Sequence, residues 1–388
     1  MNSLPLPDTR SFDGDTHAAV QQLLSRPLTP ARLKQFSRSH VFPLTAPGSV
    51  TFVWIGEADH VRLLRWILGG VDRQEFRRVP DTPLWLLTVP VKDGGRFEYK
   101  LGVEHNGHEQ WHLDPLNKAR AGDPYGENSV CRTFGYSQPE WSMPQGAPAG
   151  AIHPFPVSSS VFEETRDEQV YLPAGYDAEQ VYPLLVIHDG ADFITYADLA
   201  TSLDNLIALG TIPPIIAALV QTRDRLGEYA RGHRHARYVV SDLLPQLQAS
   251  YRISERSEDR ILLGASLGAV ASLATVFRYP GVFGGAVLQS GSFILDEGKL
   301  EGRPHPVFRK VARLIKAVRR APNMPAFRAF VSSGELEGLA SENEALARLL
   351  QENGVSVLFK SAWDGHHWHN WRDQLRDGLV WALDSDSS

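Results

Sequence analysis

Residues 261–270, ILLGASLGAV, constrain the fold of this chain more than any other stretch. An apolar run typical of a β-strand enters a Gly-x-Ser-x-Gly turn, and small residues with helical spacing follow it. Strand, sharp turn and helix together form a nucleophile elbow, which presents a serine hydroxyl at its tip. Because Gly-x-Ser-x-Gly alone is a common turn sequence, the interpretation depends on the flanking strand and helix. We predict Ser266 as the nucleophile.

The two glycines of the motif, Gly264 and Gly268, are expected to let backbone pass closely on either side of the turn. The backbone N–H after the serine, on Leu267, is then aimed at the place where an oxyanion would form.

Length and composition bound the class of protein. A chain of 388 residues exceeds the usual size of one hydrophobic core, so two domains are expected. The 43% hydrophobic and 22% charged residues indicate a folded protein. A formal net charge of -6 argues against nucleic acid or an acidic membrane surface as a partner. Cys131 is the single cysteine, so no intrachain disulfide and no cysteine-based metal cluster can form, and we interpret it as an inert thiol.

The first fifteen residues hold prolines and aspartates but no basic segment followed by an apolar one, so we expect no signal peptide. No apolar run approaches the roughly 20 residues that a membrane helix requires. These two patterns predict a cytoplasmic protein.

Two short helices are expected in the N-terminal segment, residues 1–40, at 15–26 and 29–38. Thr29 suits the N-cap of the second helix, and Pro30 suits its first position. We expect this segment to act as a packing or lid element.

Between residues 48 and 113 the apolar pattern takes the period of two that marks β-strands, with turn pairs such as Gly69 and Gly70 between runs. Aromatic residues such as Phe52 recur there, and a sandwich core explains them better than a ligand platform. We assign a β-sandwich domain to residues 41–150. Its expected strands are 49–55, 60–68, 75–79, 84–89, 96–103 and 110–113.

A connector rich in proline and glycine follows, residues 114–156, with the sequences DPLN, DPYG and MPQGAPAG. Such residues disfavour regular strand ladders and mark a boundary, so we place the domain change near residue 150.

Residues 151–388 alternate strands with helices, which predicts a mostly parallel sheet covered by helices on both faces. The order and lengths of the elements fit an α/β-hydrolase. The expected strands are 169–172, 184–188, 215–220, 286–289, 328–331 and 355–360, and the expected helices are 198–209, 233–251, 307–319, 342–353 and 370–383.

A serine is a poor nucleophile at neutral pH, so the elbow predicts an acid and then a histidine further along the chain. The acid is expected in VSSGELEG, residues 331–338, after the second strand beyond the nucleophile. Glu337 is the first choice and Glu335 the second. The alternative is that both are solvated loop carboxylates.

The base is expected in the loop after the last strand, DGHHWHNW, where His366 follows the glycine directly. Three histidines so close also suggest zinc, but their spacing is not the i, i+4 pair that places two ligands on one helical face. We therefore predict no metal and no cofactor, and interpret His367 and His369 as polar lining or a helix start.

A second oxyanion donor is expected in IHDGADF, residues 187–193. Gly190 would allow the turn, and the amide of either Gly190 or Ala191 would face the site.

Several of these pieces recur together in one known family. HDGADF, RDRLGEY, DLLPQL, GASLGA, FGGAVLQSGSF and DGHHWHNWRDQL resemble the enterochelin (enterobactin) esterase family of α/β-hydrolases. The preceding β domain, with DPLN and DPYG at its exit, is similar to the early-set immunoglobulin-like domain of those proteins. The resemblance covers about residues 48–384.

This resemblance implies Ser266 as nucleophile, His366 as base and Glu337 as acid. It also implies that Arg225 contacts substrate, since Arg225 and Glu228 are similar to a charged pair that the family keeps near the site. The alternative for that pair is a structural ion pair.

The implied substrate is a small-molecule ester, a siderophore triester or its ferric complex, with a hydroxylated aromatic acyl group held near Trp368 and Trp371. Both tryptophans are equally explained as core anchors. The chain departs from the family at His367, where an acidic residue is usual.

Three other functions stay open at this point: a carboxylesterase of the feruloyl or acetyl-xylan type, a non-catalytic small-molecule-binding homologue, and, on the fold alone, a peptidase. The β domain could cap the site or mediate a homodimer.

Overall fold

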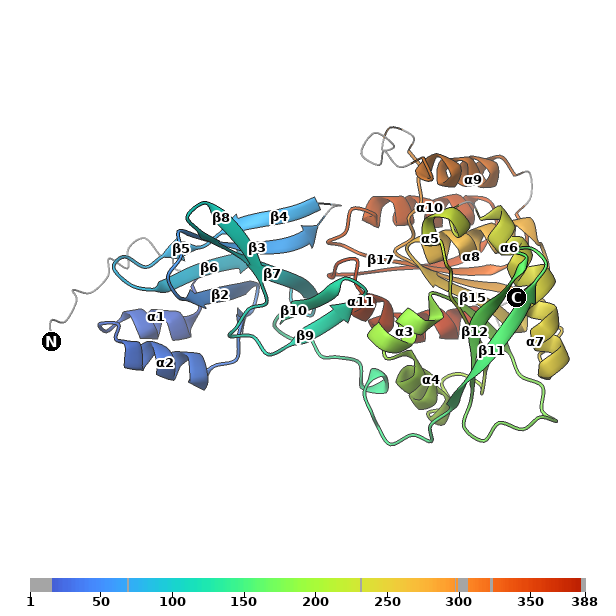
Figure 1. The fold of residues 1–388 in the computed structure, drawn as a ribbon, viewed down its shortest axis with the longest axis horizontal. Helices are drawn as coiled ribbons and strands as arrows, with labels where there is room; N and C mark the ends of the chain where they lie inside the picture. The colour runs from blue at the N-terminus through green and yellow to red at the C-terminus, as the bar shows by residue number, and fades with distance from the viewer. Residues whose placement is uncertain are drawn as a thin grey trace. The chain divides into compact units, whose positions relative to one another are not determined.

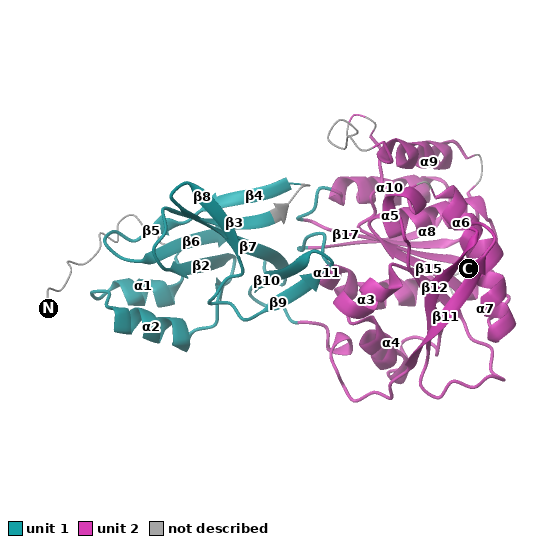
Figure 2. Ribbon diagram, viewed as in Figure 1, with its two compact units in different colours: residues 1–137, 336–338, 363–367 teal, residues 138–335, 339–362, 368–388 magenta. Residues whose placement is uncertain are grey.

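The computed structural model describes residues 16–67, 70–230, 232–296, 298, 306–321 and 324–384. The expectation about a signal peptide in residues 1–15 and the Gly69 turn therefore lie outside the described residues. Figure 2 shows two compact units. Unit 1 comprises residues 1–137, 336–338 and 363–367, and unit 2 comprises residues 138–335, 339–362 and 368–388. The division thus assigns residues 138–150 to unit 2 and keeps the N-terminal helices with the β-strands.

Unit 1 contains two sheets built from neighbouring antiparallel strands (Figure 1). The four-stranded sheet has the order β1 (Leu44–Ala46), β2 (Ser49–Ile55), β6 (Leu84–Pro90), β5 (Arg77–Arg78). The six-stranded sheet has the order β4 (Gly70–Glu75), β3 (His60–Ile67), β7 (Arg96–His105), β10 (Gly126–Arg132), β9 (Arg120–Asp123), and β8 (His108–His112) also pairs with β7.

The period of two along β2 explains how unit 1 packs. Val50 and Phe52 point into a core shared with residues of the second sheet, among them Phe97 and Leu101. Val53, on the opposite face of β2, joins a second cluster with the helices α1 (Ala18–Leu24) and α2 (Pro30–Ser39). These helices therefore act as packing elements, and the sandwich core expected for the aromatic residues is confirmed.

The cap expected on α2 is present. The Thr29 hydroxyl accepts a hydrogen bond from the Arg32 N–H at 3.3 Å, and Pro30 is the first residue of the helix. A threonine at this position satisfies an N–H that the helix cannot pair internally.

The expectation that residues 114–156 form no ladder is wrong. They contain β9, β10, the 3-10 turn η2 (Glu140–Ser142) and most of β11 (Ala151–Ser159). DPYG is the turn of the β9–β10 hairpin, where the Tyr125 N–H donates to Asp123 Oδ1 at 2.6 Å. The edge strand β11 tolerates Pro154 and Pro156, because alternate N–H groups of an edge strand point away from its neighbour.

Unit 2 is built on one eight-stranded sheet with the order β11, β12, β14, β13, β15, β16, β17, β18. The first three strands are antiparallel neighbours, and all pairs from β14 to β18 are parallel. This confirms the α/β-hydrolase fold. The bounds are β12 (Glu164–Leu172), β13 (Leu184–His188), β14 (Ile216–Val220), β15 (Arg260–Ala265), β16 (Gly285–Gln289), β17 (Arg328–Gly334) and β18 (Ser356–Ala362).

Helices cover both faces of this sheet. Successive side chains of its buried strands point to opposite faces, so both faces are apolar. Val186 joins one apolar cluster, whereas Leu185 and Ile187 join the other. The first cluster includes Tyr229 and Ala230, which follow α5 (Arg225–Glu228), and residues of α6 (His233–Tyr238), α7 (Leu244–Ser250), α8 (Leu267–Arg278), α9 (Phe308–Arg320) and α10 (Ala340–Glu352). The second includes residues of α3 (Gly190–Tyr196), α4 (Leu199–Ala208), α11 (Trp368–Asp373) and α12 (Leu375–Leu383).

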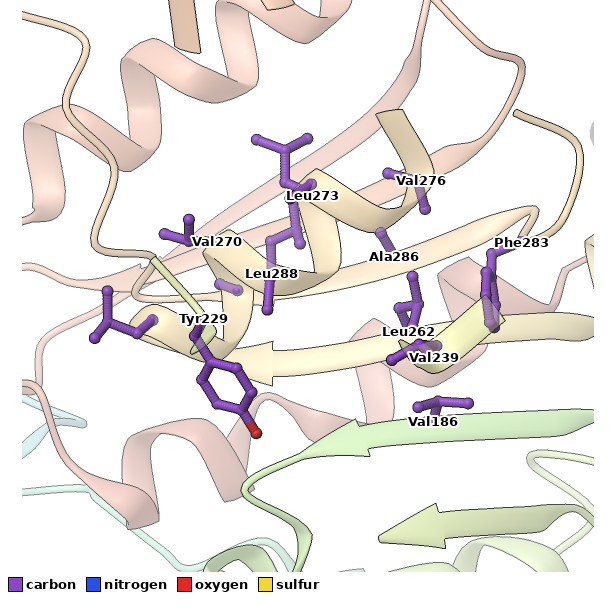
Figure 3. Close-up of a cluster of buried hydrophobic side chains, with 14 of the residues drawn as sticks. Val186, Tyr229, Val239, Leu262, Val270, Leu273, Val276, Phe283, Ala286 and Leu288 are labelled. Carbon is purple, nitrogen blue, oxygen red and sulfur yellow. The ribbon is translucent and has the colours of Figure 1, made fainter. Parts of the chain in front are cut away.

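Helix α8 lies against the middle of the sheet. Figure 3 shows Val270, Leu273 and Val276 of this helix near Leu262 of β15 and Leu288 of β16. All five side chains are buried, so the helix that follows the elbow is anchored by its apolar face.

The long helix expected at 233–251 is interrupted. Residues Val239–Leu243 form a π-helical turn, η3, between α6 and α7. Pro245 follows this turn in α7 and has no N–H to donate back into the preceding turn, which favours the change of helical register.

Within the described part of the chain, no helix is both long and apolar enough to cross a membrane.

Candidate active site

Ser266 connects β15 to α8 in a backbone conformation that residues other than glycine rarely adopt, with φ 57° and ψ −116°. Its N–H donates to the Gln289 carbonyl at 2.9 Å, and its carbonyl accepts from the Ser292 N–H at 3.0 Å. Both partners belong to β16 or the turn after it. Since these contacts hold the strained turn from one side, the expected elbow is present at Ser266.

The glycines on either side of the serine differ in how tightly they are packed. A Cβ on Gly264 would lie 2.3 Å from the backbone carbon of Gly268, which no backbone shift of a few tenths of an ångström could relieve. A Cβ on Gly268 would lie 3.1 Å from the His188 Cβ, a tight but adjustable contact. Of these two positions, only Gly264 therefore requires glycine for the close approach of the backbone.

The loop before α3 brings a second set of N–H groups toward the elbow. Asp189 is the N-cap of α3 and takes the left-handed conformation, with φ 58° and ψ 40°. Gly190 is the first residue of the helix, and a Cβ there would lie 2.5 Å from the Leu219 Cα. The expectation that Gly190 allows the turn is wrong: Asp189 makes the turn, and Gly190 is needed for close packing.

The three amides expected to bind an oxyanion lie in first turns of helices, where the helix itself supplies no acceptor. Those of Gly190 and Ala191 belong to α3, and that of Leu267 belongs to α8. The two segments are neighbours in unit 2, because Gly268 packs against His188 and Asp189. N–H groups at the start of a helix favour a nearby negative charge, so the expected oxyanion role of these three amides stays a prediction.

Arg225 ties this loop to the elbow. Its Nε donates to Asp189 Oδ2 at 2.9 Å, and its Nη2 donates to the Ala265 carbonyl at 3.3 Å, directly before the serine. Its side chain is 40% exposed, so the guanidinium keeps access to solvent. Glu228 instead pairs with the buried Arg166. Arg225 and Glu228 therefore do not pair with each other, and each belongs to a separate ion pair.

The acid and base candidates meet in unit 1. His366 Nδ1 is hydrogen-bonded to Glu337 Oε2, with 2.5 Å between the two atoms. Glu337 is 3% exposed, whereas the His366 side chain is 34% exposed. The structure thus joins His366 to the first choice of acid. The backbone N–H of the second choice, Glu335, donates to the Ala362 carbonyl at 2.8 Å.

The neighbouring histidine has a different environment. His367 Nδ1 lies 3.4 Å from Glu98 Oε2, and burial lowers the pKa of the imidazole even though the Glu98 charge opposes that shift. A buried imidazole beside a carboxylate supports the polar-lining interpretation of His367. Among the described residues, no group of three or more His, Cys, Asp and Glu side chains could hold a metal ion.

The tryptophans expected near a substrate lie in the second apolar cluster of unit 2. Trp368 is 9% exposed and stacks edge-on against Phe193, with 5.2 Å between ring centroids. Trp371 is 4% exposed, and its indole N–H donates to Ser290 Oγ at 2.9 Å. These contacts favour the core-anchor interpretation over a role in holding substrate.

The comparison with known proteins follows this geometry. Residues 159–382 match the family model Esterase, described as "Putative esterase". The matched region is more than half of the chain. The chain belongs to this esterase family.

Relatives of this esterase-family chain include two iron(III) enterobactin esterases of Escherichia coli. The K12 enzyme is 24% identical over 370 residues, which cover 85% of this chain and 90% of the relative. The enzyme of strain CFT073 is 24% identical over 274 residues, which cover 69% of this chain and 66%, just under two thirds, of the relative. A crystal structure of ferric enterobactin esterase from Salmonella typhimurium has a TM-score of 0.75 at 21% identity, covering 90% of this chain and 98% of that chain. At such low identity the structural similarity establishes the fold.

The expected membership of an enterochelin esterase-like family, with its class of carboxylic ester hydrolases, is confirmed by these matches.

Two polar residues beside the elbow of this esterase-family chain were not expected from its sequence. Ser292 Oγ lies 3.0 Å from Ser266 Oγ, and Asp189 holds Arg225. The sequence did hold a sign of both residues. Ser292 lies in QSGSF at the end of β16, and Asp189 lies in IHDG at the end of β13. Both strands are parallel to β15, and parallel strands end at a common edge of the sheet.

Proposed function

We propose that this chain is a serine carboxylesterase that works through an acyl-enzyme, with Ser266 as nucleophile, His366 as base and Glu337 as acid. The observation that carries the proposal is the 2.5 Å hydrogen bond between His366 Nδ1 and the buried Glu337 carboxylate. A buried carboxylate on one imidazole nitrogen fixes the tautomer and stabilises the imidazolium, which leaves Nε2 to exchange the proton.

In the proposed first step, His366 Nε2 takes the proton of the Ser266 hydroxyl as Oγ attacks the ester carbonyl carbon. The carbonyl oxygen becomes an oxyanion, which the Leu267 amide and an amide of Gly190 or Ala191 would stabilise. His366 then gives its proton to the leaving alcohol as the ester bond breaks. Water attacks the acyl-enzyme in the second step, with the same histidine as base, and releases the acid and the free serine.

The proposed substrate class is a catecholate siderophore triester or its ferric complex, in which iron enters as part of the substrate. The relatives named as iron(III) enterobactin esterases support this class. Arg225 supports it independently, because its side chain is 40% exposed and its guanidinium, tied to Asp189, can bind an anionic substrate. We favour Arg225 over the buried Trp368 and Trp371 as the substrate contact.

The test is hydrolysis of a short-chain p-nitrophenyl ester and of a catecholate siderophore triester by wild type and Ser266→Ala. Ser250→Ala is the matched control, since Ser250 is an exposed serine of α7 whose hydroxyl donates to the Gln246 carbonyl. We expect both substrates to be cleaved, with a loss of about 10⁴-fold or more in kcat for Ser266→Ala alone.

Each other outcome has a definite meaning. Cleavage of only the simple ester, or of feruloyl or acetyl-xylan esters, would replace the siderophore substrate by the other carboxylesterase class. Tight binding without turnover in wild type would favour the non-catalytic homologue. Activity that survives in Ser266→Ala would refute the serine mechanism itself.

The cytoplasmic location and the homodimer stay predictions. Light scattering of the purified chain would decide between monomer and dimer.

A further inference from the structure

The loops that carry Glu337 and His366 pack on the β-sandwich within unit 1 (Figure 2). Leu336 and Trp363 are partly buried and pack against the apolar core of the sandwich. The Trp363 ring stands edge-on to Phe97 of β7, with 5.8 Å between centroids. The Arg96 N–H donates to the Trp363 carbonyl at 3.1 Å, so the start of the histidine loop is docked along β7.

The fit is close at the beginning of β7. A Cβ on Gly95 would lie 2.5 Å from the Trp363 carbonyl oxygen. The Gly95 N–H and carbonyl are both engaged by the Thr133 hydroxyl, at 2.9 and 3.0 Å. The surface that receives the loop is therefore itself held in place by the residue after β10.

Arg96 adds a buried charged contact to this docking. The residue is 2% exposed, and its guanidinium bridges two carboxylates, Asp364 Oδ2 at 2.8 Å and Glu98 Oε1 at 2.9 Å. A planar guanidinium can make two such directed contacts at once, which an ammonium group cannot reproduce.

Asp364, which pairs with Arg96, also hydrogen-bonds to the backbone of both loops. Its Oδ1 accepts the Gly365 N–H at 2.7 Å, and its carbonyl accepts the Leu336 N–H at 3.0 Å. Gly365 precedes His366, and Leu336 precedes Glu337. One aspartate thus fixes the backbone directly before each member of the proposed acid–base pair.

Glu98 contacts His367, the residue after His366. Its Oε2 accepts from Asn128 Nδ2 at 3.0 Å and lies 3.4 Å from His367 Nδ1. Burial raises the pKa of Glu98, but the charges of His367 and Arg96 and the hydrogen bonds from Arg96 and Asn128 outweigh it and lower the pKa to about 2. The carboxylate is therefore ionised on the β7 side of the loop.

We propose that Arg96, with Glu98, is a positioning residue for the acid–base pair: the β-sandwich fixes residues 363–367 so that His366 Nδ1 stays on Glu337. The esterase role rests on the proposed function. A buried ion pair is weak evidence for stability, because desolvation offsets much of its attraction. Its geometric effect is more direct, since proton transfer requires the imidazole to be held within a fraction of an ångström.

The test compares Arg96→Lys, which keeps the charge but loses the double contact, with Asp364→Asn, which keeps the shape of the side chain. Arg65→Lys is the matched control, because Arg65 is a buried arginine in the same unit that pairs with Asp72. We expect kcat to fall about 10- to 100-fold in the two test variants, with KM within about threefold, and the control to stay within about twofold of wild type.

A second measurement reports on His366 without turnover. The proton in a short imidazole–carboxylate hydrogen bond gives a far-downfield NMR signal, which His366→Ala would assign. We expect this signal to shift or broaden in Arg96→Lys and Asp364→Asn, and to persist in Arg65→Lys and Ser266→Ala.

The inference is overturned if both test variants fold and keep the wild-type kcat and signal. It is also overturned if the activity they lose is no more than their loss of thermal stability accounts for. An inactive wild type would instead refute the proposed function, and the downfield signal alone would then decide the positioning role.

Discussion

The elbow and the acid–base loops reach their geometry by different means. Ser266 is held by backbone: a strained turn, hydrogen bonds to β16, and a glycine contact that excludes any Cβ. The pair of His366 and Glu337 is held by side chains, above all by Arg96, which is 268 positions away from Asp364 in the sequence. The first device can be recognised in ten consecutive residues, and the second only in a folded structure.

This difference predicts which changes each part tolerates. Backbone geometry is sensitive to added volume and insensitive to charge, whereas a side-chain network is sensitive to charge and fork geometry. Substitutions that change either the volume or the charge of a side chain, but not both, test this comparison of the elbow with the acid–base loops.

The largest effect is expected in the acid–base pair. Glu337→Gln keeps the size of the side chain but removes the charge on His366 Nδ1. We expect kcat to fall by about 10² to 10⁴-fold, because the amide neither fixes the tautomer nor stabilises the imidazolium. Steady-state kinetics on a p-nitrophenyl ester measure it, with Glu335→Gln as the control that keeps most activity. The reverse ranking would assign the acid to Glu335.

A stability effect of more than about 3 kcal/mol is expected at the elbow for Gly264→Ala, since its Cβ would overlap the backbone of Gly268. Gly268→Ala should lie within about 1 kcal/mol of wild type, because its tightest contact is with a side chain and alanine favours the helix. Urea unfolding of both variants decides this. Equal destabilisation would mean that the motif requires both glycines for the same reason.

The smallest effect is expected on stability at low pH. The pKa of Glu98 is lowered from 4.5 to about 2, so its stabilising contribution is complete above pH 4.5 and is lost as pH falls toward 2. A shift of this size corresponds to about 3 kcal/mol over that window. In Glu98→Gln the free energy of unfolding should depend less on pH there, as pH-dependent urea unfolding would show. Glu127→Gln, an exposed position on β10, should keep the wild-type slope.

Much of the fold was predictable because its elements have strong local patterns. β2 and β13 match their expected bounds, since side chains of β2 alternate between two faces and β13 is a buried run that is apolar up to His188. The missed strands β10 and β11 depend on their neighbours instead. β10 is polar at its start and gains its ladder from β7, and β11 carries two prolines that only an edge position tolerates.

The candidate site divides in the same way. The family resemblance implied Glu337 as the acid, and the turn at Ser266 and the loop that carries Glu335 and Glu337 followed from motif spacing and the order of strands. The turn at Asp189, the contact of Ser292 and the bridge made by Arg96 did not, because each depends on a partner that is remote in sequence. The burial of Trp368 and Trp371 likewise depends on Phe193 and Ser290.

Unit 1 is built from three separate segments of the chain, which has a consequence for the expression of fragments. A fragment that starts at residue 138 would still encode every strand of the large sheet, and would look complete by its elements. It would nevertheless leave the Trp363 and Leu336 side chains bare and the Asp364 carboxylate without its guanidinium. Such a fragment would be a poor starting point for crystallisation, because the loops that carry Glu337 and His366 would have lost the residues they pack against.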